Sequence, residues 1–236
     1  MDLRNVDLRK HVVLLSGATG TVGGAFAKFV LAHGGSLALA VRRRHQVAGV
    51  AAAFGTARVL PGVVAPQDGE AAAGFVKGAE DALGPITAFV CTAGRWNSEP
   101  VGKEPAGQLL ELLEANLLTG SNLARAVIGR MRRRGRGTLT FVGSAAVGSP
   151  APMPANYLAS KAALHEYVRA LALELHGSGV TVSAVLPGVI DTAENRRAMP
   201  DADTSHWLSL DRVVAALAAR AFGPADGGGP LYPLPG

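Results

Sequence analysis

A chain of 236 residues, 48% of them hydrophobic, suits one α/β domain with a sizeable core and excludes extensive disorder. The single cysteine excludes an internal disulfide framework and is typical of a reducing compartment, so we expect a cytoplasmic protein. The formal charge is +5, but aromatic residues make up only 5% and none is interleaved with the arginine runs at 42–44 and 132–136. We therefore expect solvated basic faces and no nucleic-acid partner.

The N-terminal segment places basic residues before an apolar run, as a signal peptide does. Asp2, Asp7 and Gly17 interrupt that pattern, so we do not expect a signal peptide there. The sequence holds no stretch of about 18 uncharged apolar residues, which is the length a membrane-spanning helix needs. We expect no membrane partner.

Short apolar segments alternate with helical patterns along the chain. Strands are expected at 11–16, 37–41, 59–64, 86–91, 138–142 and 181–186, with a weaker edge strand at 231–233, where prolines count against it. Helices are expected at 24–33, 71–83, 108–134, 156–176 and 210–222. This alternation predicts one domain over 1–236, built on a doubly wound parallel sheet with helices on both faces. The irregular stretch 191–210 is long for a connection and predicts a substrate lid.

A glycine-containing loop follows the first strand and opens the first helix. Glycines there let the backbone turn tightly and approach a pyrophosphate, whose charge the helix N-terminus favours. Such spacing also arises from ordinary turns, but its place after the first strand favours dinucleotide binding. The loop residues expected to contact the dinucleotide are Gly17, Thr19, Gly20, Thr21, Val22 and Gly23.

The second strand ends without the carboxylate that would accept hydrogen bonds from an adenosine ribose. It runs instead into Arg42, Arg43 and Arg44. Because an arginine accommodates a 2′-phosphate, we predict NADP(H) as the preferred cofactor, with NAD(H) as the alternative. Arg42 is the first candidate contact and Arg43 the second; the competing interpretation is a solvated basic turn.

Tyr157 and Lys161 stand four residues apart on an expected helix, which places them on one face. The ordinary pKa of tyrosine is about 10, and a nearby ammonium is expected to lower that pKa and make the pair an acid/base unit. Ser144 follows the strand at 138–142, at an edge where ligands bind in open α/β sheets. Its hydroxyl could hold a substrate oxygen toward the tyrosine, although a turn serine is the alternative.

Together with Ala93, Gly94, Asn116, Pro187 and Gly188, these features resemble the short-chain dehydrogenase/reductase family over essentially the whole chain. The resemblance implies a Rossmann fold, bound NAD(P)(H), and hydride transfer paired with proton transfer through Tyr157. It implies catalytic roles for Asn116, Ser144, Tyr157 and Lys161. Lys161 would also bind the nicotinamide ribose, and Asn116 would lie at a helix kink supporting a proton-relay water. Further cofactor contacts would be Ala93, Gly94, Tyr157, Pro187, Gly188, Ile190 and Thr192.

Several positions depart from the family pattern. Thr21 stands where the middle glycine of the usual loop falls, and Cys91-Thr92 replaces the usual Asn-Asn before Ala-Gly. Val63 and Thr87 replace frequent aspartates. The departures affect the expected adenine contacts and local rigidity, and they leave the proton-transfer residues in place.

Segments 91–96 and 184–207 resemble the dihydropteridine reductase branch more narrowly. Trp96 lies near the expected substrate site and could stack on a flat ring, or it could only pack the lid. That branch favours NADH and generally lacks the serine, whereas this chain has no acidic residue after the second strand and has Ser144. We therefore expect an ordinary carbonyl-reductase site.

The leading hypothesis is an NADP(H)-dependent enzyme that reduces a ketone, an aldehyde or a related C=N substrate, with Ser144, Trp96 and Tyr157 contacting this small molecule. The alternatives are a cofactor-sensing protein without turnover and a dihydropteridine reductase-like enzyme. No metal is expected. The resemblance implies a homodimer or homotetramer, which the apolar helix face around 109–118 would permit.

Overall fold

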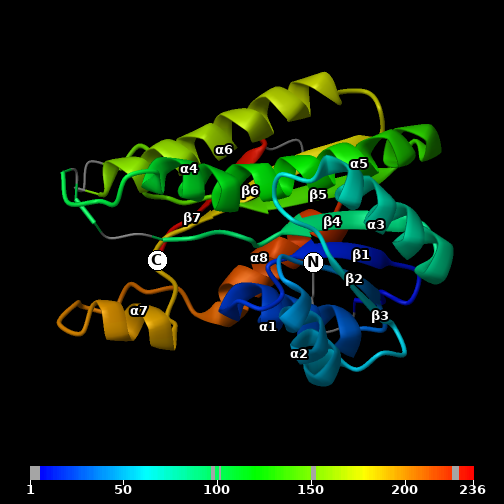
Figure 1. Ribbon diagram of the computed structural model, residues 1–236, viewed down its shortest axis with the longest axis horizontal. Helices are drawn as coiled ribbons and strands as arrows, with labels where there is room; N and C mark the ends of the chain where they lie inside the picture. Colours follow the sequence, from blue (N-terminus) through cyan, green and yellow to red (C-terminus); the bar gives the residue numbers. More distant parts are fainter. Residues whose placement is uncertain (1–5, 97–98, 101, 150–152, 225–228) are drawn as a thin grey trace.

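The computed structural model describes residues 6–96, 99–100, 102–149, 153–224 and 229–236 (Figure 1). One seven-stranded sheet runs through the molecule in the order β3-β2-β1-β4-β5-β6-β7, and all its pairings are parallel. Its strands are β1 (Val12–Ser16), β2 (Ser36–Val41), β3 (Val59–Val63), β4 (Ile86–Cys91), β5 (Gly137–Val142), β6 (Val180–Pro187) and β7 (Leu231–Leu234). The predicted doubly wound parallel sheet is confirmed.

Helices cover both faces of the sheet (Figure 1). One face packs against α1 (Thr21–Ala32), α2 (Arg44–Phe54) and α8 (Leu210–Phe222), and the other against α3 (Gly69–Leu83), α5 (Thr119–Arg134) and α6 (Ala155–Glu174). Each face has its own buried apolar cluster, because alternate side chains of a strand point to opposite faces. Every residue of β1 is buried, as expected for a central strand covered on both sides.

Three helical features differ from the expectation. Helix α2 was not predicted. It begins at Arg44, the last residue of the arginine run, and at its start the Gln46 side chain accepts the backbone N–H groups of Arg42 (3.1 Å) and Arg43 (2.9 Å). The lid segment contains a short helix, α7 (Ala193–Ala198). The expected helix 108–134 is divided into α4 (Gln108–Leu113), a π-helical turn η2 (Glu114–Leu118) and α5.

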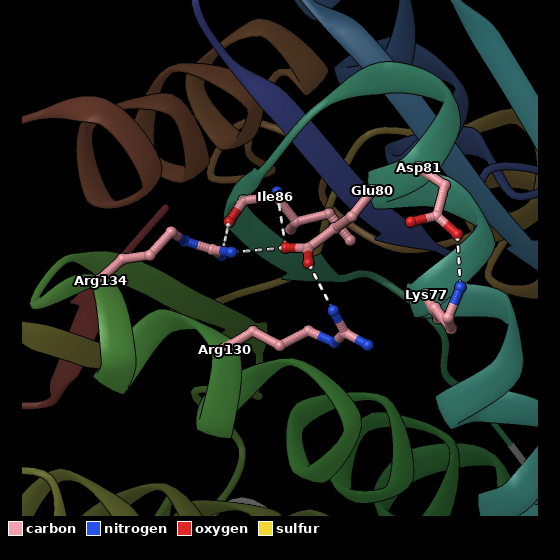
Figure 2. A network of polar contacts seen from close by, with 6 residues as sticks. All are labelled: Lys77, Glu80, Asp81, Ile86, Arg130 and Arg134. Atoms are coloured by element: carbon pink, nitrogen blue, oxygen red, sulfur yellow. Dashed lines mark hydrogen bonds and ion pairs between the residues drawn. The ribbon is translucent and has the colours of Figure 1, made fainter.

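The expected solvated arginine face is wrong for Arg134. Arg134 and Arg130 each contact Glu80 at 2.8 Å, and the Glu80 side chain is only 11% exposed (Figure 2). Arg134 also donates to the carbonyl of Ile86, while the Ile86 amide donates to Glu80. The cluster therefore joins α3 and α5 to the first residue of β4, at the edge of the sheet opposite the strand ends that form the site described below.

None of the helices described in the structure is both long enough and apolar enough to cross a membrane.

Candidate active site

A cleft of about 330 Å³ lies where the carboxyl ends of β1, β2 and β4 meet. Successive strands add outward from β1 to β3, and β4 then returns to the other side of β1. Such a reversal of strand order is where open α/β sheets bind ligands. The sequence-predicted cofactor residues that line the cleft are Gly17, Thr19, Gly20, Arg42, Arg43, Ala93 and Gly94.

The glycine loop is held close to the end of β4. Gly17 has a φ of 86°, and a Cβ there would lie 2.5 Å from the Ala93 nitrogen, so a larger residue is excluded by conformation and by space. A Cβ at Gly23 would lie 2.1 Å from the Gly17 carbonyl oxygen. Thr92, a departure from the family pattern, donates its hydroxyl to the Ser16 carbonyl at 2.8 Å and bridges the two strand ends.

The polar character of the cleft suits a phosphorylated ligand. Helix α1 has no side-chain N-cap and no acidic residue in its first turn, so its N-terminal amides remain available to an anion. Arg42, Arg43 and Arg95 line the cleft, and none of its described lining residues carries a carboxylate. Arg42 and Arg43 are exposed and form no ion pair within the part of the chain that the structure describes.

Some predicted cofactor residues lie outside the cleft lining. Thr21 and Val22 begin α1, and Val63 is exposed at the end of β3, where Val64 lines the cleft instead. In the expected nicotinamide loop, the Gly188 amide donates to the Leu234 carbonyl at 3.1 Å. Pro187 lies close to Ser144, because its carbonyl accepts the amide of the next residue, Ala145, at 3.0 Å.

The remaining residues of the expected nicotinamide loop are engaged locally. Ile190 forms an isolated parallel bridge with Leu208. The Thr192 hydroxyl accepts the backbone N–H of Asn195 at 3.1 Å and caps α7. Both are therefore part of the ordered start of the lid segment.

Lys161 is buried beneath the end of β5. Its ammonium donates to the Val142 carbonyl at 3.0 Å, and only 5% of the residue is exposed. Burial lowers the pKa of Lys161 to about 8, because the charged form loses its hydration. A Cβ at Gly94 would lie 3.4 Å from the lysine nitrogen, so Gly94 connects the cleft to this group.

The expected direction of the Tyr157 pKa shift is wrong. Burial raises the pKa of Tyr157, and a hydrogen bond with Ser144 offsets only part of that effect. The physical reason is that desolvation disfavours the phenolate, while the ammonium of Lys161 is engaged by a backbone carbonyl. Tyr157 is therefore a neutral phenol near neutrality, a form that can donate a proton.

Trp96 lies beside the phenol. The indole and Tyr157 rings meet edge to face, with centroids 4.5 Å apart and planes at 70°. Trp96 is nevertheless 47% exposed, so it covers one side of the tyrosine and presents the rest of its ring to solvent. The placement fits the predicted substrate position, and the described contacts of Trp96 do not include α7.

Asn116 fastens the loop after β4 to α6. Its side-chain oxygen accepts the Arg95 amide at 2.7 Å, and its nitrogen donates to the Arg95 carbonyl and to the Ser160 hydroxyl, at 3.1 and 2.8 Å. It lies in the π-helical turn, where the Thr119 hydroxyl donates to the Glu114 carbonyl at 3.0 Å. Both polar ends of the Asn116 side chain are thus engaged in positioning; the proton-relay water stays a prediction.

Sequence reasoning missed several polar residues around this site, among them Arg95, Gln46 and His165. Gln46 lines the cleft and caps α2, and it was missed because α2 itself was not recognised. His165 accepts the Ser144 amide at 3.2 Å. Its only signal in the sequence is its place four residues after Lys161 on the same helix.

Comparison with known proteins agrees with this geometry. A family model described as short chain dehydrogenase matches residues 11–203. The putative ketoacyl reductase of the monensin polyketide synthase from Streptomyces virginiae is 34% identical over 215 residues, covering 89% of this chain and 82% of that one. A gluconate 5-dehydrogenase from Burkholderia cenocepacia J2315, solved in complex with NADP and tartrate, superposes with a TM-score of 0.85 at 21% identity and covers 99% of this chain and 96% of that one.

The narrower resemblance extends over part of the chain only. A dihydropteridine reductase from Dictyostelium discoideum is 34% identical over 139 residues, which are 56% of this chain and 58% of that one.

The burial of Lys161 predicts a cost in stability. Replacing it by methionine keeps a long side chain without the charge, so we expect Lys161→Met to raise the free energy of unfolding at pH 7 by about 1–2 kcal/mol. One pKa unit corresponds to about 1.4 kcal/mol, so lowering the pKa from 10.5 to about 8 costs roughly 3 kcal/mol, and leaving the Val142 carbonyl without its donor offsets about 1–2 kcal/mol of that. Urea unfolding measures this difference, with the exposed Lys77→Met as the control.

The pH dependence of unfolding has a definite sign. Between pH 8 and 10.5 the unfolded chain holds the Lys161 proton more tightly than the folded one, so wild-type stability gains from this group as the pH rises. The difference in free energy of unfolding between Lys161→Met and the wild type should therefore become smaller as the pH rises from 8 to 10.5. A variant that is less stable than the wild type at pH 7 would contradict the account.

Proposed function

The chain belongs to the short-chain dehydrogenase/reductase family of oxidoreductases, and from that premise we propose that it reduces a ketone, an aldehyde or a related C=N compound with NADPH. The observation that carries the proposal is the continuity of the site. A carboxylate-free cleft with three arginines leads past Gly94 to the buried Lys161 and the neutral phenol of Tyr157.

Different residues of the cleft would bind different parts of the cofactor. The amides at the start of α1 would bind the pyrophosphate, with Gly17 and Gly20 allowing close approach. Arg42 and Arg43 would bind the 2′-phosphate, since both lack a carboxylate partner among the described residues and an arginine fits a phosphate in a bidentate manner. A fold neighbour solved with NADP supports the same class of cofactor.

NADPH, when bound, supplies the hydride. Tyr157 donates its phenolic proton to the oxygen or nitrogen that gains charge as the hydride arrives. Because burial raises its pKa further, this phenol is protonated near neutrality and can act as the proton donor. Ser144, whose side-chain hydrogen bond lowers the pKa of Tyr157, would present its hydroxyl to the same substrate atom and stabilise the developing negative charge there.

Lys161 lies beneath the tyrosine on the same helix. With a pKa of about 8, its ammonium is the form present at neutral pH, where it would bind the nicotinamide ribose while its hydrogen bond to the Val142 carbonyl holds α6 against the end of β5. Asn116 holds Ser160 and the Arg95 backbone, so the helix that carries Tyr157 keeps its place against the cleft. Trp96 shields one side of the phenol from water.

A ketone is the substrate class that we favour. The relative named as a ketoacyl reductase supports it, and Ser144 is present to hold a carbonyl oxygen. The indole of Trp96 also suits a flat heteroaromatic compound, as in the partly matching dihydropteridine reductase. A panel of activated ketones, diones and quinonoid dihydropterin, followed by NADPH oxidation, separates the two substrate classes.

Tyr157→Phe tests the proton donor. We expect kcat to fall by about 10²- to 10⁴-fold, the usual contribution of general acid catalysis, while the Kd for NADPH stays within about threefold. The matched control is Tyr167→Phe on the same helix, whose ring packs against Phe141 in the core. NADPH oxidation and fluorescence titration give the two quantities. Near-normal kcat in Tyr157→Phe would refute the assignment, and NADPH binding without oxidation of any panel compound would indicate a cofactor sensor.

Arg42→Ala tests the cofactor preference. We expect NADPH affinity to fall by roughly tenfold or more while NADH affinity is unchanged, because a charge-assisted hydrogen bond is worth about 1.5–3 kcal/mol. Arg44→Ala removes a neighbouring charge that does not line the cleft and serves as the control. Equal affinities for NADPH and NADH in the wild type would overturn the preference.

A further inference from the structure

His165 continues the row of functional side chains on α6. Tyr157, Lys161 and His165 are spaced by four residues, so they lie along one face of the helix. His165 is only 3% exposed and follows Lys161 toward the C-terminal end of α6. The mechanism described above uses the first two of these residues and not the third.

Lys161 and His165 each form a hydrogen bond with the backbone at the end of β5, one just before Gly143 and one just after it. Lys161 donates to the Val142 carbonyl at 3.0 Å, and the Ser144 amide donates to Nε2 of His165 at 3.2 Å. Gly143 lies between these two peptide groups. A Cβ there would lie 2.5 Å from Nε2 of His165, so the ring reaches the backbone only because residue 143 is glycine.

The contact bears directly on the serine hydroxyl. The oxygen of Ser144 accepts the Ala146 amide at 3.2 Å, which leaves the hydroxyl hydrogen free to point toward the phenol and the substrate. The backbone amide of Ser144 bonds to His165, while the amides on either side of it, of Gly143 and Ala145, bond to carbonyls of β6, so the ring is the side-chain partner that holds the serine backbone. The Ser144 side chain in turn forms the hydrogen bond with Tyr157.

A purely apolar packing role does not account for this arrangement. Ser144 is buried, and a buried amide without an acceptor costs about 1–3 kcal/mol. Nε2 can accept only while it carries no proton, so the ring is neutral and protonated at Nδ1. Burial, together with the charges of Lys161 and Arg169, lowers the pKa of His165 to about 4 and keeps the ring in this form near neutrality.

We propose that His165 is a positioning residue for the reduction: its Nε2 holds the amide of Ser144 and thereby sets the direction in which the serine hydroxyl meets the substrate oxygen beside Tyr157. The inference rests on the proposed function for its catalytic consequence. The hydrogen bond itself can be tested without turnover.

Two substitutions at position 165 separate positioning from packing. His165→Leu fills the space but removes the acceptor, and we expect kcat to fall roughly 10- to 100-fold, as small misplacements of a reacting group do, with NADPH affinity within about twofold. His165→Gln places an amide oxygen near the position of Nε2, and we expect it to restore kcat to within about threefold of wild type. His11→Leu is the control, because it loses a comparable ring hydrogen bond, to Thr87 at 3.0 Å, at the opposite end of β1.

The Ser144→Ala background shows whether His165 acts through the serine. If it does, adding His165→Leu to Ser144→Ala should reduce kcat by less than about threefold, although His165→Leu alone has the larger effect. Full additivity would overturn the proposal, as would a His165→Gln variant no faster than His165→Leu, or a His165→Leu variant as fast as wild type.

Nitrogen NMR of the wild-type protein keeps the proposal testable if a variant fails to fold or no turnover is found. We expect a neutral His165 ring with the proton on Nδ1, and a correlation across the hydrogen bond between Nε2 and the Ser144 amide. A proton on Nε2 at neutral pH would overturn the proposal. Absence of NADPH oxidation by the wild type would refute the proposed function and with it the catalytic consequence, whereas the hydrogen bond from the Ser144 amide to His165 would still stand or fall by the NMR result.

Discussion

The parallel direction of all seven strands is the constraint on which the site depends. Each strand delivers the residues that follow it to the same edge of the sheet, so Ser16, Val41, Cys91, Val142 and Pro187 end side by side although they are far apart in the chain. The reversal of strand order between β1 and β4 opens the cleft at that edge. The glycine loop, the arginines and the catalytic group are brought together by this one property of the sheet.

Helix α6 sets the distances within the proposed catalytic group of Ser144, Tyr157 and Lys161. It carries Tyr157 and Lys161 one turn apart and fastens to the sheet by the hydrogen bond from Lys161 to Val142. Burying these polar groups costs stability. The pKa of Lys161, which burial lowers to about 8, reflects this cost. Such a cost is common where function and stability compete for the same position. The apolar clusters on both faces of the sheet and the Glu80 cluster at its other edge supply the compensation.

Sequence reasoning recovered the parts of this structure that depend on local patterns. Strand–helix alternation predicted the sheet, and the four-residue spacing predicted that Tyr157 and Lys161 share a face. The π-helical turn around Asn116 was not recognised as such, because the turn is fixed by tertiary contacts, those of Asn116 with Arg95 and Ser160, that lie far apart in the sequence.

Other features escaped prediction because they depend on burial and distant contacts. The pKa of Tyr157 moves opposite to the expectation, since depth of burial is invisible in a spacing argument. His165 escaped notice because a lone helical histidine reveals nothing until its partner, the Ser144 amide, is placed beside it.

The central claim is that this edge of the sheet couples hydride transfer from NADPH to proton transfer from Tyr157. Isotope effects in a single turnover test it most directly, using a ketone substrate, NADPH deuterated at the hydride-donating carbon, and deuterated water in turn. The account predicts that each replacement slows the same reductive step. A reductive step that deuterated NADPH leaves unchanged, or that proceeds equally fast in deuterated water, would contradict it.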